Sequence, residues 1–269
     1  MVTFEKVKKK DLGVLLGYGF REEKPKTGYE SARYTGPCVL ILYNSGKLLV
    51  QGSKNEVTRI KKVLAKLGIG REILRQEFKE ETGTVIGSDE TLKGDTFGGL
   101  VVVGVKADDR HREKLSRLRI ADSKTIPDSE IPKISKQIKK IAPYSVKSIN
   151  PEEYNRSELT PLLNRLHKEV KQELGEGMHI VDKYPGCMVG DLMVEQADSK
   201  YIEVAAASII ARDEALNQLK ELSVQAGFEL PKGSTHVREA LVELKKRNLP
   251  FEKYVKLHFK NVKEFMILE

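Results

Sequence analysis

The stretch TVIGSDETLKGDTFGGLVVVGV, residues 84–105, decides the fold of the second half of the chain. It contains two short apolar runs, at 84–86 and 100–103, which are rich in β-branched residues and bounded by glycines. Such runs are typical of strands buried within a sheet. Asp89 and Glu90 follow the first run, where burial would have to be offset by a cation, a proton or hydrogen bonds. An ordinary turn that contains two adjacent acids is the alternative interpretation.

The length and composition of the chain set the broad class. Its 269 residues favour two domains of unequal size, and 39% hydrophobic with 32% charged residues describes a soluble globular protein. The sequence contains no apolar run long enough to span a bilayer and opens without the apolar core of a secretory signal, so a cytoplasmic location is predicted. Cys38 and Cys187 match no zinc or redox spacing and are interpreted as reduced packing thiols.

The excess positive charge lies entirely in the first third of the chain. Residues 1–80 carry 17 Lys and Arg against 9 Asp and Glu, whereas residues 81–269 carry 30 of each kind. A concentrated positive charge favours a polyanionic partner, because neutralising phosphates releases counterions. A merely solubilising surface is the alternative. We therefore expect a basic module that contacts nucleic acid, followed by a neutral module.

The basic module is predicted to fold as a small sheet backed by a helix. Residues 38–43 and 47–51 flank a glycine-containing turn and indicate a β-hairpin. Ser53 and Glu56 have capping-box spacing, and a stripe of apolar residues follows at helical spacing. The other face of the sheet is expected to be open, and residues suited to stacking on bases or pairing with phosphates are Tyr29, Arg33, Tyr34, Tyr43 and Lys47. Ordinary packing of the tyrosines is the alternative.

The neutral module alternates strand-like and helix-like stretches, which predicts an α/β domain. Helices are expected near 109–118 and 128–141, a strand near 144–149, and a helix to about residue 174 with Thr160 as its cap and Pro161 in its first turn. Residues 178–182 then form a buried strand that ends in Asp182, and Asp198 precedes another long helix. Asp198 could also be only a capping or surface acid. Together the four acids offer oxygen ligands alone, which suits magnesium or manganese rather than zinc.

The order and spacing of several short motifs give a resemblance that spans nearly the whole chain. The sequence resembles the type 2 ribonucleases H and is most similar to their ribonuclease HIII branch. The resemblance rests on the following motifs: Gly87-Ser88-Asp89-Glu90 with Gly94-Asp95 and Phe97-Gly98; Asp122-Ser123-Lys124; Ala207-Ser208-Ile209-Ile210-Ala211-Arg212; Leu230-Pro231-Lys232-Gly233; Arg33-Tyr34; and Ser45-Gly46-Lys47-Leu48-Leu49-Val50-Gln51-Gly52.

The resemblance implies a specific domain organisation. A small α+β domain similar to half of a TATA-binding protein is expected at 1–70 and a linker at 71–83. An RNase H-like α/β catalytic domain, with a mixed central sheet flanked by helices, is expected at 84–269. The implied activity is hydrolysis of the RNA strand of RNA/DNA hybrids, leaving 5′-phosphate and 3′-hydroxyl ends.

The resemblance also implies roles for individual residues. The catalytic carboxylates, which would hold two Mg²⁺ or Mn²⁺ ions, are Asp89, Glu90, Asp182 and Asp198, with Asp89 as the expected bridging ligand. The residues expected to contact substrate are Lys93, Gly94, Ser123, Lys124, Arg33, Tyr34 and Lys47, with Lys232 and Thr235 as weaker candidates. His236 is interpreted as structural. The expected partner is an RNA/DNA hybrid or a ribonucleotide-containing duplex, bound by a monomer without an obligate protein partner or a membrane.

One departure from the family pattern bears on substrate choice. The family places a glycine, a variable residue and a second glycine after the acid pair, whereas this chain has Leu92-Lys93-Gly94. Leu92 adds a Cβ where close backbone approach or a positive φ is needed. Relaxed sugar selectivity, or a shift between hybrids and single embedded ribonucleotides, is therefore an open hypothesis. The rivals are a hybrid-binding protein without catalysis and a metal-dependent DNA nuclease of the same fold.

Overall fold

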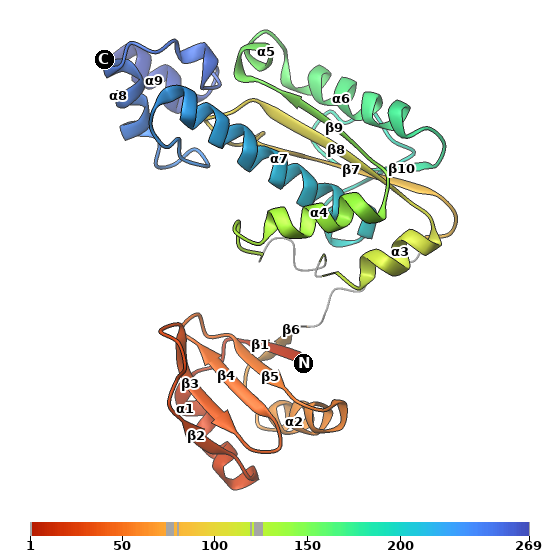
Figure 1. Cartoon of the computed structure of the whole chain (residues 1–269), viewed down its shortest axis with the longest axis vertical. Helices are drawn as coiled ribbons and strands as arrows, with labels where there is room; N and C mark the ends of the chain where they lie inside the picture. Colours follow the sequence, from red (N-terminus) through yellow and green to blue (C-terminus); the bar gives the residue numbers. More distant parts are fainter. Residues whose placement is uncertain (1, 74–77, 80, 119, 121–125, 269) are drawn as a thin grey trace. The chain divides into compact units, whose positions relative to one another are not determined.

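The computed structural model describes residues 2–73, 78–79, 81–118, 120 and 126–268. The chain divides into two compact units, residues 1–75 and 76–269. Each unit has a sheet of its own (Figure 1). Among the described residues, no helix combines the length and the apolar character that a membrane crossing would require.

The first unit is an antiparallel sheet with helices packed on one face. Its six strands lie in the order β2-β3-β4-β5-β1-β6. The bounds of its elements are β1 Val2–Glu5, α1 Lys9–Leu12, β2 Arg21–Glu23, β3 Glu30–Thr35, β4 Val39–Tyr43, β5 Leu48–Gln51, α2 Lys54–Lys66 and β6 Arg71–Ile73, with a 3₁₀ helix at Gly13–Tyr18.

The hairpin and helix predicted in this unit are confirmed. β4 pairs with β5, and the turn between them is closed by a hydrogen bond from the Gly46 amide to the Tyr43 carbonyl. The Ser53 hydroxyl accepts a hydrogen bond from the Glu56 amide at 3.3 Å and so caps α2. The linker expected at 71–83 begins differently, because β6 pairs with β1 and lengthens the sheet.

The second unit is a mixed five-stranded sheet with the strand order β11-β10-β7-β8-β9. β10 pairs in parallel with β7 and β11, and the remaining neighbours are antiparallel. The bounds of its elements are β7 Val85–Thr91, β8 Leu100–Ala107, α3 Asp109–Ser116, α4 Ile131–Ile141, β9 Tyr144–Ile149, α5 Pro151–Asn155, α6 Leu159–Leu174, β10 Met178–Asp182, β11 Leu192–Val194, α7 Ile202–Ala226, α8 Arg238–Lys246 and α9 Lys260–Leu268, with 3₁₀ helices at Ala197–Ser199 and Phe251–Lys253.

Helices cover both faces of this sheet. α3, α4 and α7 lie on one face and α5 with α6 on the other (Figure 1). Two separate apolar clusters correspond to these layers: one joins β8 to α4 and α7, and the other joins β8 and β10 to α6. β8 supplies both clusters because its side chains alternate between the faces, with Val101 and Val103 on one side and Leu100 and Val102 on the other. The predicted mixed α/β architecture is confirmed.

The start of α6 differs from the prediction. The helix begins at Leu159, so Thr160 lies inside its first turn and does not cap it. The Thr160 hydroxyl instead donates a hydrogen bond to the Pro185 carbonyl at 3.4 Å. Pro161 remains in the first turn, where its missing N–H leaves no helical hydrogen bond unmade.

Candidate active site

The first acid, Asp89, lies within β7 and is 8% exposed. The strand continues to Thr91, so the acid pair is part of the sheet and does not follow it as expected. Burial, together with the nearby charges of Glu90 and Asp182, raises the pKa of Asp89 well above its usual range. A hydrogen bond with Ser208, on α7, acts in the opposite direction. Asp89 is thus a buried carboxyl group in strongly negative surroundings.

The second acid, Glu90, is held from two sides. Its Oε1 accepts a hydrogen bond from Lys93 Nζ at 2.5 Å, and its Oε2 lies 3.5 Å from His167 Nε2. Burial alone would raise the pKa of Glu90, but the interactions with His167 and Lys93 outweigh burial and lower it. The pKa values of the two neighbouring acids are therefore shifted in opposite directions, upward for Asp89 and downward for Glu90.

Asp182 approaches this pair from the neighbouring strand, and Asp198 lies in the short helix before α7. Asp182 ends β10, which runs parallel to β7, so its carboxylate is close enough to influence Asp89. Its Oδ1 accepts a hydrogen bond from the Ala197 amide at 2.9 Å. Asp198 follows Ala197 in the sequence. It lies in the 3₁₀ helix before α7 and is 6% exposed. The fold thus brings Asp89, Glu90 and Asp182 together and fixes the backbone beside Asp198 to the same cluster.

The chemistry of this cluster suits a hard divalent cation. Its donors are carboxylate oxygens, and burial together with the acidic neighbours raises the pKa of Asp89. Glu90 Oε2 is buried without a hydrogen-bond partner among the described residues. In the described ranges, however, no three His, Cys, Asp or Glu side chains are gathered closely enough to enclose an ion as they stand.

The loop after the acid pair has an unusual backbone. Leu92 adopts φ +66°, in the left-handed region that favours glycine, and its side chain is 4% exposed. A hydrogen bond from the Asp95 amide to the Leu92 carbonyl closes the turn at 3.1 Å. Lys93 lies 5.8 Å from the centre of the Tyr184 ring, and Gly94 is exposed with open space where a Cβ would stand. The non-glycine residue thus keeps a conformation that glycine adopts freely.

The residues of the first unit that were expected to contact substrate do not share one face of the sheet. Arg33 and Tyr34 are successive residues of β3 and point to opposite faces. Tyr34 is 2% exposed in the core, which corrects the expectation that its ring contacts substrate. Arg33 lies on the other face, where Nε and Nη2 donate to Glu30 at 2.9 and 2.8 Å. Lys47 is half-buried at the end of the hairpin turn.

The remaining sequence-predicted residues belong to the second unit. Ser123 and Lys124 lie outside the described residues. Lys232 forms an ion pair with Asp128, while Thr235 and His236 are exposed.

Sequence reasoning missed a group of buried polar residues behind the acid pair. Ser88, His167 and His179 are each at most 3% exposed and form a hydrogen-bonded chain, and Tyr184 stacks on the His167 ring with centroids 5.3 Å apart. The alternation of β7 placed Ser88 and Glu90 on one face, which was the available signal. The histidines come from α6 and β10, so their convergence depends on the tertiary fold.

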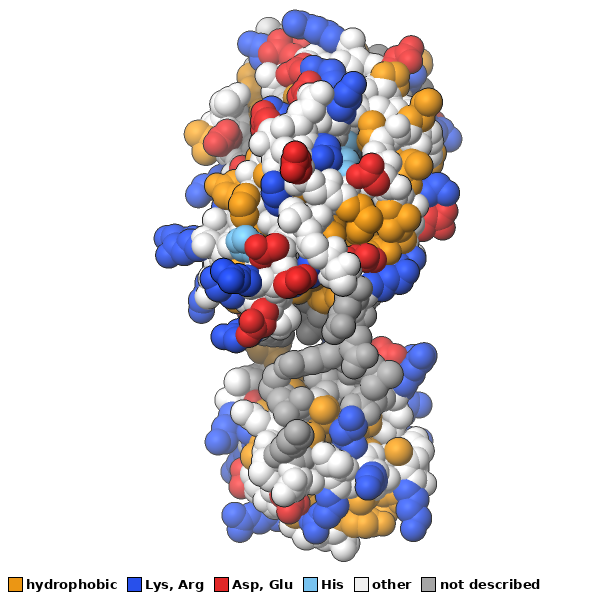
Figure 2. Space-filling model, turned by 90° about the vertical axis from the view of Figure 1, so that its right-hand side faces the viewer, with side chains coloured by type: hydrophobic (Ala, Val, Ile, Leu, Met, Phe, Trp, Pro, Cys, Tyr) orange, Lys and Arg blue, Asp and Glu red, His pale blue; other side chains and the backbone are white. Residues whose placement is uncertain are grey.

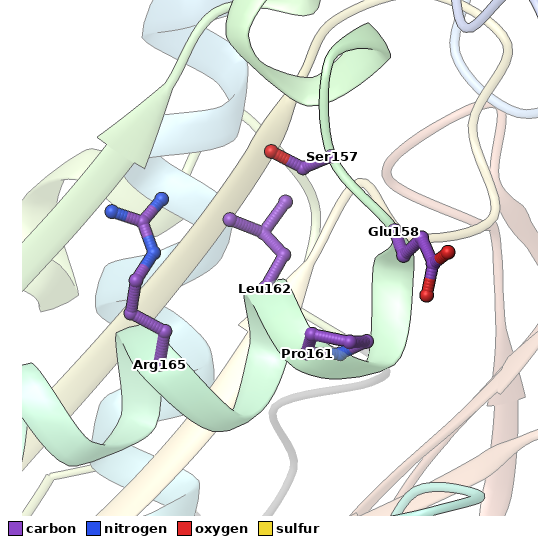
Figure 3. Close-up of a pocket in the computed structure, with 5 residues that line it drawn as sticks. All are labelled: Ser157, Glu158, Pro161, Leu162 and Arg165. Atoms are coloured by element: carbon purple, nitrogen blue, oxygen red, sulfur yellow. The ribbon is translucent and has the colours of Figure 1, made fainter.

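A pocket between α5 and α6 does not compete with this cluster. It is lined by Ser157, Glu158, Pro161, Leu162 and Arg165, and the Glu158 carboxylate points away from Arg165 (Figure 3). One divergent pair of charged side chains offers no converging acids for chemistry.

Comparison with known proteins agrees with the fold. The family model described as Ribonuclease HII matches residues 86–262. The chain belongs to the ribonuclease HII family. It is a ribonuclease H, and its curated relatives carry the name Ribonuclease HIII. The protein from Exiguobacterium sibiricum is 28% identical and the match covers 98% of this chain and 95% of that protein. The protein from Bacillus anthracis is 30% identical, with 86% and 87% covered.

Solved ribonuclease structures share the fold across both units. Bst-RNase HIII in complex with Mn²⁺ has a TM-score of 0.63 at 26% identity, covering 99% of this chain and 98% of that one. Aquifex aeolicus RNase H3 has a TM-score of 0.56 at 29% identity, covering 96% and 100%. The whole of this ribonuclease H, including its N-terminal unit, therefore has a counterpart among these structures.

Proposed function

We propose that this ribonuclease H is an endonuclease that hydrolyses the RNA strand of RNA/DNA hybrids. Two Mg²⁺ or Mn²⁺ ions would be held by Asp89, Glu90, Asp182 and Asp198, and the products would carry 5′-phosphate and 3′-hydroxyl ends. The observation that supports this most directly is the burial of Asp89 beside the charges of Glu90 and Asp182. A solved relative named as a complex with Mn²⁺ supports the choice of cation.

The side chains have distinct tasks in this proposal. When bound, the ions supply an activated water for in-line attack on phosphorus and charge stabilisation for the leaving 3′ oxygen. Asp89 is the proposed central ligand because the charges of both Glu90 and Asp182 act on it. Lys93, whose side chain is 38% exposed, pairs with Glu90 and can exchange that partner for a backbone phosphate.

The remaining substrate contacts are proposed around this centre. Gly94 leaves space for the sugar-phosphate backbone beside the acids. Ser123 and Lys124 are proposed to hold the same backbone. Lys and Arg side chains are scattered over the visible face of the first unit (Figure 2), and Arg33 and Lys47 are proposed as its contacts to the duplex.

The Leu92 conformation bears on the choice between substrates. Its φ of +66° keeps the left-handed turn, so the loop backbone remains available to approach a 2′-hydroxyl. We therefore place hybrid cleavage ahead of a relaxed duplex nuclease. Cleavage at single embedded ribonucleotides is the alternative that the same loop supports.

A side-by-side cleavage assay tests the proposal. Equal amounts of an RNA/DNA hybrid, a DNA duplex with one ribonucleotide and an all-DNA duplex are incubated with Mg²⁺, with Mn²⁺ and with a chelator. Metal-dependent cleavage of the hybrid, with 5′-phosphate ends on the fragments, is expected. Cleavage of DNA alone would replace the proposal with a DNA nuclease, and binding without cleavage would replace it with a non-catalytic hybrid-binding protein. Light scattering on the hybrid complex tests the further proposal that the enzyme acts as a monomer.

A further inference from the structure

Three buried side chains from three elements form one hydrogen-bonded chain behind the acid pair. Ser88 Oγ, on β7, lies 2.8 Å from His167 Nδ1, on α6, and 2.8 Å from His179 Nε2, on β10. Ser88 and His167 have no measurable exposure, and His179 is 3% exposed. Bulk solvent therefore does not reach these hydrogen bonds.

This series of side chains leads to Glu90. His167 Nε2 lies 3.5 Å from Glu90 Oε2, and within the described part of the protein neither atom makes a hydrogen bond of ordinary geometry. Ser88 and Glu90 are two residues apart on one strand, so both face α6. The ring of Tyr184 stacks on the imidazole of His167 and restricts its rotation. Buried polar atoms without a hydrogen-bond partner are rare in folded proteins, so this facing pair calls for an explanation.

The donors and acceptors of this chain can be assigned. Ser88 has one hydrogen to donate, so it can donate to only one of the two histidines. If it donates to His167 Nδ1, the N–H of His179 donates to Ser88 and the Nε2–H of His167 faces Glu90. The reverse direction would aim the lone pair of a neutral His167 at the carboxylate.

The state of His179 is compatible with this direction. Burial lowers the pKa of His179 to about 4, with the neighbouring His167 and Lys171 acting in the same sense and Asp191 opposing them. A neutral His179 has one N–H, which the chain uses toward Ser88. The backbone amide of His179 donates to Asp191 Oδ2 at 2.7 Å and helps to fix this end of the chain.

We propose that His167 is a positioning residue for Glu90, orienting it as a metal ligand through an Nε2–H that is fixed by Ser88 and His179. This inference rests on the proposed metal site. His167 holds Oε2 on the buried side, so Oε1, which Lys93 reaches from the exposed side, is the oxygen that is presented to a cation. Losing a hydrogen-bond partner of a metal-ligating side chain typically weakens metal binding 10- to 100-fold.

A pair of His167 variants separates orientation from packing. The amide nitrogen of glutamine can occupy the position of Nε2, whereas that of asparagine reaches only the position of Nδ1 and leaves Glu90 without a donor. The full chain is titrated with Mn²⁺, and the free ion is followed by its paramagnetic resonance signal. His167→Asn is expected to bind Mn²⁺ roughly tenfold more weakly, and His167→Gln within about threefold of the unsubstituted protein.

Circular dichroism melts accompany each titration. Ser88→Ala removes a single oxygen and serves as a second variant if His167→Asn does not fold. It is expected to weaken Mn²⁺ binding by about threefold or more, because the tautomer of His167 is then no longer fixed. Unchanged affinity in the folded variants, or equal losses in His167→Asn and His167→Gln, would overturn the proposal.

The same titration distinguishes this inference from the proposed function. Asp89→Asn is included as a reference variant that removes a proposed ligand. If the unsubstituted chain does not bind Mn²⁺, or Asp89→Asn binds it equally well, the proposed metal site is wrong. If both behave as expected and the His167 variants retain full affinity, only the positioning role is wrong.

Discussion

Gly87 and Val204 bring β7 and α7 into direct backbone contact, since a Cβ added at Gly87 would lie 2.4 Å from the Val204 amide nitrogen. The same Cβ would lie 2.5 Å from the Glu203 carbonyl carbon, and neither backbone atom can move as a side chain could. Only glycine permits this approach, two residues before Asp89.

Gly87→Ala is therefore expected to destabilise the protein and to displace Asp89 from Ser208. Overpacking of this kind costs about 1–3 kcal/mol, and backbone atoms place it toward the upper end. Urea unfolding measures the loss, with Gly94→Ala as the stability control because open space surrounds that position. Equal unfolding midpoints for the two variants would show that β7 and α7 are not in close contact.

Arg112→Met is expected to cost more stability than Glu203→Gln. Arg112 Nη1 lies 2.8 Å from Glu203 Oε1, whose side chain is 1% exposed. Burial raises the pKa of Glu203 even though Arg112 opposes the shift. Removing the arginine leaves a buried carboxylate unpaired, at a cost of about 3–5 kcal/mol, whereas the glutamine removes the charge itself. Thermal unfolding of both variants at pH 7 checks the order; a larger loss in Glu203→Gln would contradict it.

His179 makes stability depend on pH below neutrality. Its folded pKa of about 4 lies below the ordinary value of 6.5, so between these values the unfolded chain binds a proton that the folded chain does not. The free energy of unfolding should therefore fall as the pH is lowered from 6.5 toward 4, by up to about 3 kcal/mol from this residue. His179→Gln lacks this contribution, so its stability deficit relative to the unsubstituted protein should shrink between pH 7 and pH 5 in urea titrations. A constant deficit would argue against a neutral buried His179.

Leu92→Gly exchanges two opposing contributions to stability. Glycine relieves a left-handed conformation that costs about 1–2 kcal/mol, but it removes a buried leucine side chain worth about 2–5 kcal/mol. The net result is expected to be a destabilisation of about 1–3 kcal/mol by urea unfolding. Because the turn is retained, the ratio of cleavage rates on hybrid and single-ribonucleotide duplexes should change less than about threefold. A larger change in this ratio would assign substrate selectivity to the Leu92 side chain.

Local patterns in the sequence were sufficient for much of the fold. The hairpin at Tyr43–Gly46, the cap at Ser53 and the strand that ends in Asp182 depend on turn chemistry, capping and hydrophobic runs, and all three are present. The mixed sheet with helices on both faces also follows the predicted alternation of strands and helices.

The errors involve choices that tertiary contacts decide. Asp89 lies inside β7 because pairing with β8 continues through Thr91, and Thr160 is displaced from the cap because its hydroxyl contacts Pro185. The aromatic ring of Tyr34 is suited to stacking on a base, but the register of β3 points this side chain into the core.

Of the candidate site, only the acidic residues were proposed from the sequence, and the buried histidines were not. Asp89, Glu90 and Asp182 could be proposed because carboxylates near strand ends are visible in one dimension. His167 and His179 meet Ser88 only after α6 and β10 pack against β7, across 79 and 91 residues of sequence. No local pattern carries that information.

The most direct test of the central claim compares Asp89→Asn with Asp109→Asn on an RNA/DNA hybrid in saturating Mg²⁺. Asp109 is an exposed acid that pairs with Arg112 outside the cluster, so its variant controls for loss of a negative charge. The cleavage rate should fall by roughly a hundredfold or more in Asp89→Asn and stay near that of the unsubstituted enzyme in Asp109→Asn. Hybrid cleavage at an undiminished rate by folded Asp89→Asn would contradict the proposed metal centre.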